Sequence, residues 1–306
     1  FDYKEKHISS ILKLNDVDVE SIRKRKFKIV VDGINSSGGV FVPFLLEKLG
    51  VEVIKLNCNP NGNFAHDPEP LPKNLTKLSS LVVSMQADLG IAVDPDVDRL
   101  VFVCENGSFF GEEYTIVAIA KYILSKRKGN TVCNLSSSNA LKDITLSYGG
   151  SHFYSPVGEA NVIQVMKENN AIFGGEGSGG VIFPNLHYGR DALVGIALFL
   201  SLISREKIKV THLKGMLPKY YMLKEKIEIS NDFSFDYFLQ KYKDTFSGVK
   251  NIILIDGLRI DLECGSWIHV RKSNTEPIIR IISESNSQEK VFELMEDIIV
   301  KLKNIK

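Results

Sequence analysis

The sequence predicts an α/β protein with two similar α/β domains that contain mixed sheets, followed by a smaller α+β domain with a mostly antiparallel sheet. Three observations predict this organisation. The chain has 306 residues, which is more than a single hydrophobic core usually serves. Short apolar runs alternate with helical patterns up to about residue 212, and strand patterns then follow one another directly. We therefore expect domains at residues 1–108, 109–212 and 213–306.

In the predicted first domain, each element follows from a hydrophobic period or a turn signal. Polar residues 1–26 predict one helix, and the apolar run 27–31 predicts a strand. The glycine-rich turn at 32–39 lacks the spacing of a nucleotide-binding loop and is interpreted as structural. A helix at 40–49 ends at Gly50. The remaining elements are a helix at 75–86, strands at 51–56, 90–93 and 100–104, and a proline-rich loop at 60–72.

The same reasoning places the elements of the other two domains. The second domain is expected to contain helices at 114–124, 139–147, 160–168 and 192–203, and strands at 131–134 and 151–155. The third is expected to contain strands at 220–229, 252–255, 258–262, 266–270 and 277–283, and helices at 233–242 and 288–302. Asp256-Gly257 is typical of a hairpin turn between two of these strands.

Composition and charge exclude several classes of protein. Hydrophobic residues make up 44% of the chain and charged residues 25%, which is typical of a folded globular protein. The net charge of +1 gives no reason to expect nucleic acid or a membrane surface as a partner, and no apolar run is long enough to span a bilayer. The four cysteines form no CxxC pair, so we expect free thiols, no cysteine zinc site and a cytoplasmic location.

Three carboxylates, those of Asp94, Asp96 and Asp98, stand at alternating positions between two predicted strands. Anionic groups this close repel one another unless a cation joins them, and a ligand set of oxygens alone suits a hard divalent ion. Arg99 follows directly and can bind a phosphate group with two hydrogen bonds. We therefore predict an Mg²⁺ site that leaves room for a phosphate oxygen.

Other interpretations of this aspartate loop were weighed. A solvated acidic turn is the structural alternative. An EF-hand is excluded because Arg99 stands where that loop needs glycine. A phosphatase that uses Asp94 as its nucleophile would also place an aspartate at the end of a strand, and this alternative stays open.

A second motif lies at residues 174–180, where five glycines leave only Glu176 and Ser178 as side chains. A loop this bare allows a bulky polar ligand to approach the backbone. A carboxylate and a hydroxyl can both bond to sugar hydroxyls. We predict a sugar-binding loop, with a plain glycine-rich turn as the structural alternative.

A third motif, at residues 271–280, combines two arginines with short hydroxyl and amide donors. Arg271 and Arg280 flank a predicted turn that carries Ser273, Asn274 and Thr275. Guanidinium groups, short donors and the N–H groups of a turn together suit a phosphate monoester. We therefore predict a phosphate-binding turn rather than a surface turn with incidental arginines.

Taken together, the three motifs resemble those of the α-D-phosphohexomutases, the family that contains phosphoglucomutase, phosphomannomutase and phosphoglucosamine mutase. They occur in family order, and the resemblance covers essentially the whole chain. The amino-acid sequence most resembles those of bacterial phosphoglucosamine mutases. The motifs that carry it are Asp94-Pro95-Asp96-Val97-Asp98-Arg99, Gly175-Glu176-Gly177-Ser178-Gly179, and Arg271-Lys272-Ser273-Asn274-Thr275-Glu276-Pro277 with Arg280. The resemblance implies that this chain holds the second, third and fourth domains of a four-domain enzyme.

The resemblance also implies a mechanism and a role for each motif. In the family, a phosphoserine in the first domain exchanges its phosphoryl group with a hexose or hexosamine phosphate through a bisphosphate intermediate. The three loop aspartates would hold Mg²⁺ at that phosphoserine, with Arg99 beside them as a catalytic residue, and Glu176 and Ser178 would bind sugar hydroxyls. The residues that would hold the non-reacting phosphate are Arg271, Ser273, Asn274, Thr275 and Arg280.

Two departures from the family pattern shape the functional expectation. The Ser-His-Asn-Pro signature of the phosphorylated serine is nowhere in the sequence, and Gly180 stands where many relatives have histidine. We therefore expect that the missing N-terminal domain supplies the nucleophile and that this chain alone is inactive. The competing hypotheses are a phosphatase that uses Asp94 and a non-catalytic protein that binds sugar phosphates. The sequence does not choose between glucosamine, glucose and mannose phosphates.

Overall fold

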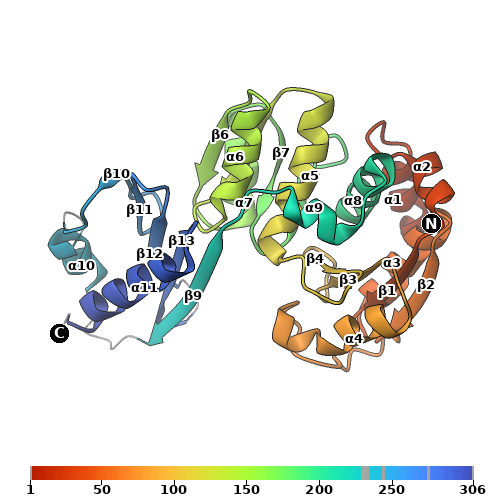
Figure 1. The fold of residues 1–306 in the computed structure, drawn as a ribbon, viewed down its shortest axis with the longest axis horizontal. Coiled ribbons are helices and arrows are strands. Elements are labelled where there is room, and N and C mark those ends of the chain that lie inside the picture. Colours follow the sequence, from red (N-terminus) through yellow and green to blue (C-terminus); the bar gives the residue numbers. More distant parts are fainter. Residues whose placement is uncertain (1, 229–233, 243–244, 274–275, 305–306) are drawn as a thin grey trace. The chain divides into compact units, whose positions relative to one another are not determined.

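A computed structural model describes residues 2–228, 234–242, 245–273 and 276–304 of the chain. It contains two compact units, each described by itself below (Figure 1). Unit 1 comprises Phe1–Tyr154 and Gly158–Pro218, and unit 2 comprises Ser155–Val157 and Lys219–Lys306. Two mixed sheets lie in unit 1 and an antiparallel sheet lies in unit 2, which confirms the predicted fold class. The expected boundaries at 108/109 and 212/213 stay a prediction.

The first sheet of unit 1 has the strand order β2-β1-β3-β4. Its strands are β1 (Lys28–Asp32), β2 (Glu52–Leu56), β3 (Leu89–Val93) and β4 (Leu100–Cys104). β1 is parallel to β2 and β3, whereas β3 and β4 are antiparallel. Helix α3 (Gly38–Lys48) contacts β1 and β2, and α4 (Thr76–Ser84), which follows the 3-10 turn η1 (Pro72–Asn74), contacts β1, β3 and β4. Every residue of β3 and β4 is buried, so the connection between them starts and ends in the core.

Two helices, rather than the single predicted one, precede this sheet. They are α1 (Tyr3–Leu12) and α2 (Val19–Arg25). The Asp18 carboxylate accepts hydrogen bonds from the backbone N–H and the hydroxyl of Ser21, so it caps a new helix in the middle of the expected one. Both helices contact α8 (Ala192–Glu206).

The second sheet of unit 1 has the strand order β6-β5-β7-β8. Its strands are β5 (Asn130–Asn134), β6 (His152–Ser155), β7 (Ala171–Glu176) and β8 (Gly180–Ile182), and its helices are α5 (Glu112–Lys126), α6 (Asn139–Ser147) and α7 (Glu159–Glu168). The apolar helix α8 is buried over most of its length. Strands β7 and β8 and the short helix α9 (Val210–Gly215) were not predicted. β7 and β8 flank the glycine-rich motif, and β8 and α9 are too short to show a hydrophobic period.

Unit 2 is built on a sheet with the strand order β10-β11-β12-β13-β9. Its strands are β9 (Tyr221–Glu228), β10 (Val249–Ile253), β11 (Leu258–Leu262), β12 (Trp267–Lys272) and β13 (Ile278–Ser285). All four neighbouring pairs are antiparallel, as expected. Helices α10 (Phe235–Tyr242) and α11 (Gln288–Lys303) share one hydrophobic core with the sheet, through Phe238, Met295 and Ile298.

None of the helices in the described parts of the chain is long and apolar enough to cross a membrane.

Candidate functional site

The connection between β3 and β4 brings the three predicted metal ligands together. One carboxylate oxygen from each of Asp94, Asp96 and Asp98 lies within 4.8 Å of the others. Asp94 is buried, Asp98 is half-buried and Asp96 is exposed, so the cluster opens from the core toward solvent. Three converging carboxylate oxygens match the ligands that Mg²⁺ prefers in proteins.

The backbone of the aspartate loop is held in a strained shape. Val97 has φ +64°, which is the left-handed region that a β-branched residue rarely adopts. Its carbonyl accepts a hydrogen bond of 3.0 Å from the N–H of Ala192 at the start of α8. On the other side of the loop, the hydroxyls of Ser36 and Ser37 donate to the carbonyl of Pro95 at 2.9 and 2.6 Å. The turn at 32–39, interpreted above as structural, therefore supports this loop.

The charges in the loop are poorly balanced by the protein itself. Asp94 Oδ1 accepts hydrogen bonds from the N–H groups of Asp98 and Arg99, at 3.0 and 2.9 Å. Even so, burial and the neighbouring carboxyls of Asp98 and Asp96 raise the pKa of Asp94 to about 7. Asp98 Oδ1 is buried and has no hydrogen-bond partner within the described part of the chain. A divalent cation bound to these oxygens would offset the repulsion between the carboxylates and give Asp98 Oδ1 a partner, so the residues fit the predicted metal.

Glu176, at the end of β7, is not free in the structure. Its side chain is almost fully buried. Oε1 accepts from the Asn134 amide at 2.8 Å and from the Gly158 N–H at 3.2 Å, and Oε2 accepts from Arg190 Nη1 at 2.6 Å. Ser178 is half-buried in the adjoining turn. The carboxylate predicted to bind sugar is therefore rigidly oriented by the protein.

Protein atoms occupy the space beside two glycines of this loop, where the sequence suggested room for a ligand. A Cβ at Gly177 would overlap with the Glu113 carboxylate, and a Cβ at Gly180 would overlap with the Arg190 side chain. The expectation that these positions expose bare backbone to a ligand is therefore corrected. The glycines allow neighbouring parts of unit 1 to approach the loop closely.

Arg190 is the residue that sequence reasoning missed. Its guanidinium contacts the Asp98 carboxylate as well as that of Glu176, so it joins the aspartate loop to the glycine loop. Burial alone would lower the pKa of Arg190, but the carboxylates of Glu176 and Asp98 outweigh it and raise this pKa. The sequence offered one signal, the absent side chain at Gly180. It did not show that an arginine ten positions later fills that space.

The predicted phosphate-binding turn lies in unit 2, between β12 and β13. Arg271 and Arg280 face each other in the antiparallel register, and like charges directly opposite one another destabilise a sheet unless an anion or an acid offsets them. Arg280 donates to Glu276 at 2.7 Å. Ser273 is buried, and its N–H donates to the carbonyl of Ile278 at 2.9 Å. Asn274 and Thr275 lie outside the described residues.

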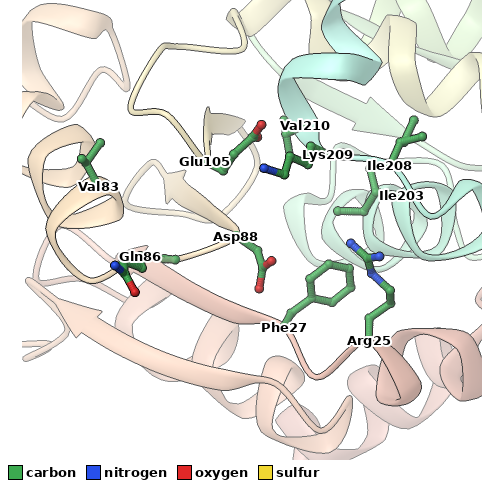
Figure 2. Close-up of a pocket in the computed structure, with 11 residues that line it drawn as sticks. Arg25, Phe27, Val83, Gln86, Asp88, Glu105, Ile203, Ile208, Lys209 and Val210 are labelled. Carbon is green, nitrogen blue, oxygen red and sulfur yellow. The ribbon is translucent and has the colours of Figure 1, made fainter.

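A cavity of about 300 Å³ lies elsewhere in unit 1 (Figure 2). Residues at the start of β3 and the end of β4 line it, among them Asp88 and Glu105. The aspartate loop follows the other end of β3, and none of the predicted site residues lines the cavity. The cavity is therefore separate from the candidate site.

Comparison with models of known protein families assigns the chain to one of them. Three domain models of phosphoglucomutase/phosphomannomutase match it: α/β/α domain II over residues 5–107, α/β/α domain III over 111–221 and the C-terminal domain over 234–301. The chain belongs to the α-D-phosphohexomutase family.

Individual relatives agree with this assignment. A phosphoglucomutase/phosphomannomutase of Thermococcus kodakarensis is 38% identical to this chain, with 92% of the chain and 62% of the relative covered. A probable phosphoglucosamine mutase of Methanopyrus kandleri is 33% identical, with 96% and 64% covered. The crystal structure of a family protein from Burkholderia thailandensis superposes with a TM-score of 0.87 at 26% identity, covering 99% of the chain and 64% of the other. The chain thus spans somewhat less than two thirds of the length of these relatives.

Proposed function

We propose that this chain supplies the metal, sugar and phosphate loops of a phosphohexomutase that interconverts the 1- and 6-phosphates of a hexose or hexosamine. Family membership supports the reaction class. The observation that carries the proposal is the convergence of Asp94, Asp96 and Asp98 within 4.8 Å, with the buried Asp98 Oδ1 left without a partner in the described part of the chain. These three carboxylates would hold Mg²⁺, which when bound neutralises charge on the transferring phosphoryl group.

The side chains around the loop would bind the phosphoryl group, the sugar hydroxyls and the second phosphate. Arg99 lies with its Nε 3.5 Å from Asp94 Oδ2, a weak contact that leaves its guanidinium able to bind phosphoryl oxygens. Glu176 already accepts two hydrogen bonds at Oε1 and one at Oε2, so its free lone pair on Oε2 would accept one hydrogen bond from a sugar hydroxyl, with Ser178 beside it. The residues proposed to hold the phosphate that does not react are Arg271, Ser273, Asn274, Thr275 and Arg280.

The nucleophile in this proposal is a phosphoserine that lies outside this chain, in a further domain of the same polypeptide. No serine of the chain stands in the Ser-His-Asn-Pro context of the family. The chain alone would therefore bind a phosphosugar weakly and would not turn it over.

The geometry of Asp94 argues against the phosphatase alternative. An aspartate nucleophile needs one oxygen that can approach phosphorus in line. Asp94 is 6% exposed, its Oδ1 already accepts two backbone hydrogen bonds, and its Oδ2 faces Arg99. This carboxylate is placed to be a ligand rather than an attacking group.

A coupled mutase assay tests the proposal with hexose and hexosamine phosphates as substrates. The complete polypeptide should be active with Mg²⁺, should lose activity on Asp96→Asn substitution, and this chain alone should show no turnover. Turnover by the chain alone would refute the external nucleophile, and phosphate release without isomerisation would support the phosphatase. A complete polypeptide that binds sugar phosphates but converts none of them would leave only a binding function.

A further inference from the structure

Three potential metal ligands meet at a second place in unit 1, away from the aspartate loop. His7 comes from α1, His187 from the loop that precedes α8, and Asp191 from the residue that caps α8. Both imidazole Nε2 atoms approach one carboxylate oxygen, Asp191 Oδ2, at 2.7 Å from His7 and 3.0 Å from His187. One ligand atom of each residue lies within 4.8 Å of the others.

The protein fixes the carboxylate of this cluster. Asp191 is 6% exposed, and its Oδ1 accepts from the N–H groups of Leu193 and Val194 at 2.7 and 3.1 Å. With that oxygen bound to the helix N-terminus, Oδ2 faces the two imidazoles. Carboxylates that bind a metal ion through one oxygen are usually held in place by hydrogen bonds to the protein.

The two histidines are partly exposed to solvent. The side chain of His7 is 34% exposed and that of His187 is 42% exposed. The cluster therefore borders solvent, and water can complete the coordination of a bound ion. Partly exposed rings can also shift, whereas fully packed ones cannot.

We propose that His7, His187 and Asp191 form a metal site for a borderline transition-metal ion such as Zn²⁺ or Co²⁺. Two imidazole nitrogens and one carboxylate oxygen, with an open position, are a ligand set that such ions favour, whereas Mg²⁺ favours oxygen alone. The site is thus chemically distinct from the aspartate loop, and the proposal does not depend on the proposed mutase activity.

Binding requires only small movements. Metal–ligand bonds of about 2.0–2.2 Å at a tetrahedral angle place nitrogen and oxygen about 3.3 Å apart. The two nitrogen–oxygen separations are 2.7 and 3.0 Å, and the ligand nitrogens lie within 4.8 Å of each other, so movements of about 1 Å or less bring the three atoms to this spacing. The ion takes the place of the Nε2 protons, and each neutral ring then carries its proton on Nδ1.

The bound ion would tie α1 to the start of α8. Arg190, which contacts both the aspartate loop and Glu176, immediately precedes Asp191. The site therefore stabilises unit 1 and holds the segment that carries Arg190.

Titration of the whole chain with Co²⁺, followed by visible absorption, tests the proposal. With Mg²⁺ in excess to occupy the three aspartates Asp94, Asp96 and Asp98, wild type should bind one Co²⁺ ion with the d–d bands of an N/O site, and Zn²⁺ should displace it. His7→Ala and His187→Ala should each weaken binding by more than the roughly 10–100-fold that loss of an outer-shell partner costs. His66→Ala is the matched control and should bind as wild type does. His66 Nε2 also pairs with a buried carboxylate, Asp32 Oδ2 at 3.1 Å, but among the described residues it belongs to no cluster of three potential metal ligands.

Metal-free melting temperatures establish that each variant folds. If His7→Ala fails to fold, His187→Ala is used for the test, because His187 lies in an exposed loop where loss of the side chain disturbs folding less. No d–d absorption in wild type, binding retained in His187→Ala, or charge-transfer bands from a cysteine thiolate would each overturn the proposal.

Discussion

Replacing Arg190 with methionine tests whether this side chain holds the aspartate and glycine loops together. The change keeps an apolar stem but leaves the carboxylates of Glu176 and Asp98 without their cation. The side chains of Arg190 and Asp98 are each 17% exposed, and that of Glu176 is 7% exposed. Removing one partner from a buried ion pair costs about 3–5 kcal/mol. Because Asp98 retains some contact with water, we expect a loss of about 3 kcal/mol in the free energy of unfolding.

Gly180→Ala supplies an independent route to the same disruption, since the new Cβ would overlap with the Arg190 side chain. Urea unfolding of wild type, both single variants and the double variant gives the coupling between the two positions. A Cβ at position 180 overlaps with Arg190 Cδ, and moving that stem breaks ion pairs only when it carries a guanidinium, so the alanine should cost at least about 1 kcal/mol less when residue 190 is methionine. Arg205→Met, at an exposed position of α8, is the matched control and should change stability by less than about 0.5 kcal/mol. Strictly additive costs would refute the link between Gly180 and Arg190.

Three further predictions concern the loops themselves. Burial, together with the neighbouring Asp98 and Asp96, raises the pKa of Asp94 to about 7, so a proton competes with the metal below that pH. Calorimetric Mg²⁺ affinity should therefore rise between about pH 6 and pH 8, and an affinity independent of pH would contradict this. In the metal-free protein the native state binds the extra proton, so the free energy of unfolding should fall as pH rises from about 4 through about 7, and Asp94→Asn should remove that fall. Val97→Asn should raise the free energy of unfolding by about 1 kcal/mol, because asparagine tolerates φ +64° better than valine; a loss of stability in thermal melts would count against backbone strain there.

The features that the sequence revealed are those whose residues lie close together along the chain. Asp94, Asp96 and Asp98 are neighbours in sequence, so their spacing alone predicted a carboxylate cluster. The antiparallel sheet of unit 2 was predicted for a similar reason, since consecutive strand patterns with turn signals pair locally. The register that places Arg271 opposite Arg280 follows from the same local pairing.

The features that the sequence hid depend on contacts between distant residues or on single caps. Arg190 reaches Asp98 across 92 positions, and no local pattern reports such a contact. The expected helix at 1–26 is two helices, because Asp18 caps the start of the second one. The polar pattern continues across this break, so it did not reveal it. The glycines at 177 and 180 were interpreted as room for a ligand, whereas side chains from elsewhere in unit 1 occupy that room.

Binding of a hexose 1,6-bisphosphate to this chain in the presence of Mg²⁺ is the most direct test of the proposed function, in which the aspartate loop and the arginine turn each take part in binding a phosphosugar. Isothermal titration should show binding that is weakened by roughly tenfold or more by Asp96→Asn, which removes a ligand of the Mg²⁺ that would bind one phosphate, and separately by Arg271→Gln, which removes a guanidinium proposed to hold the other. Arg205→Met should bind as wild type does. Binding that depends on only one of the two loops, or on neither, would contradict the account.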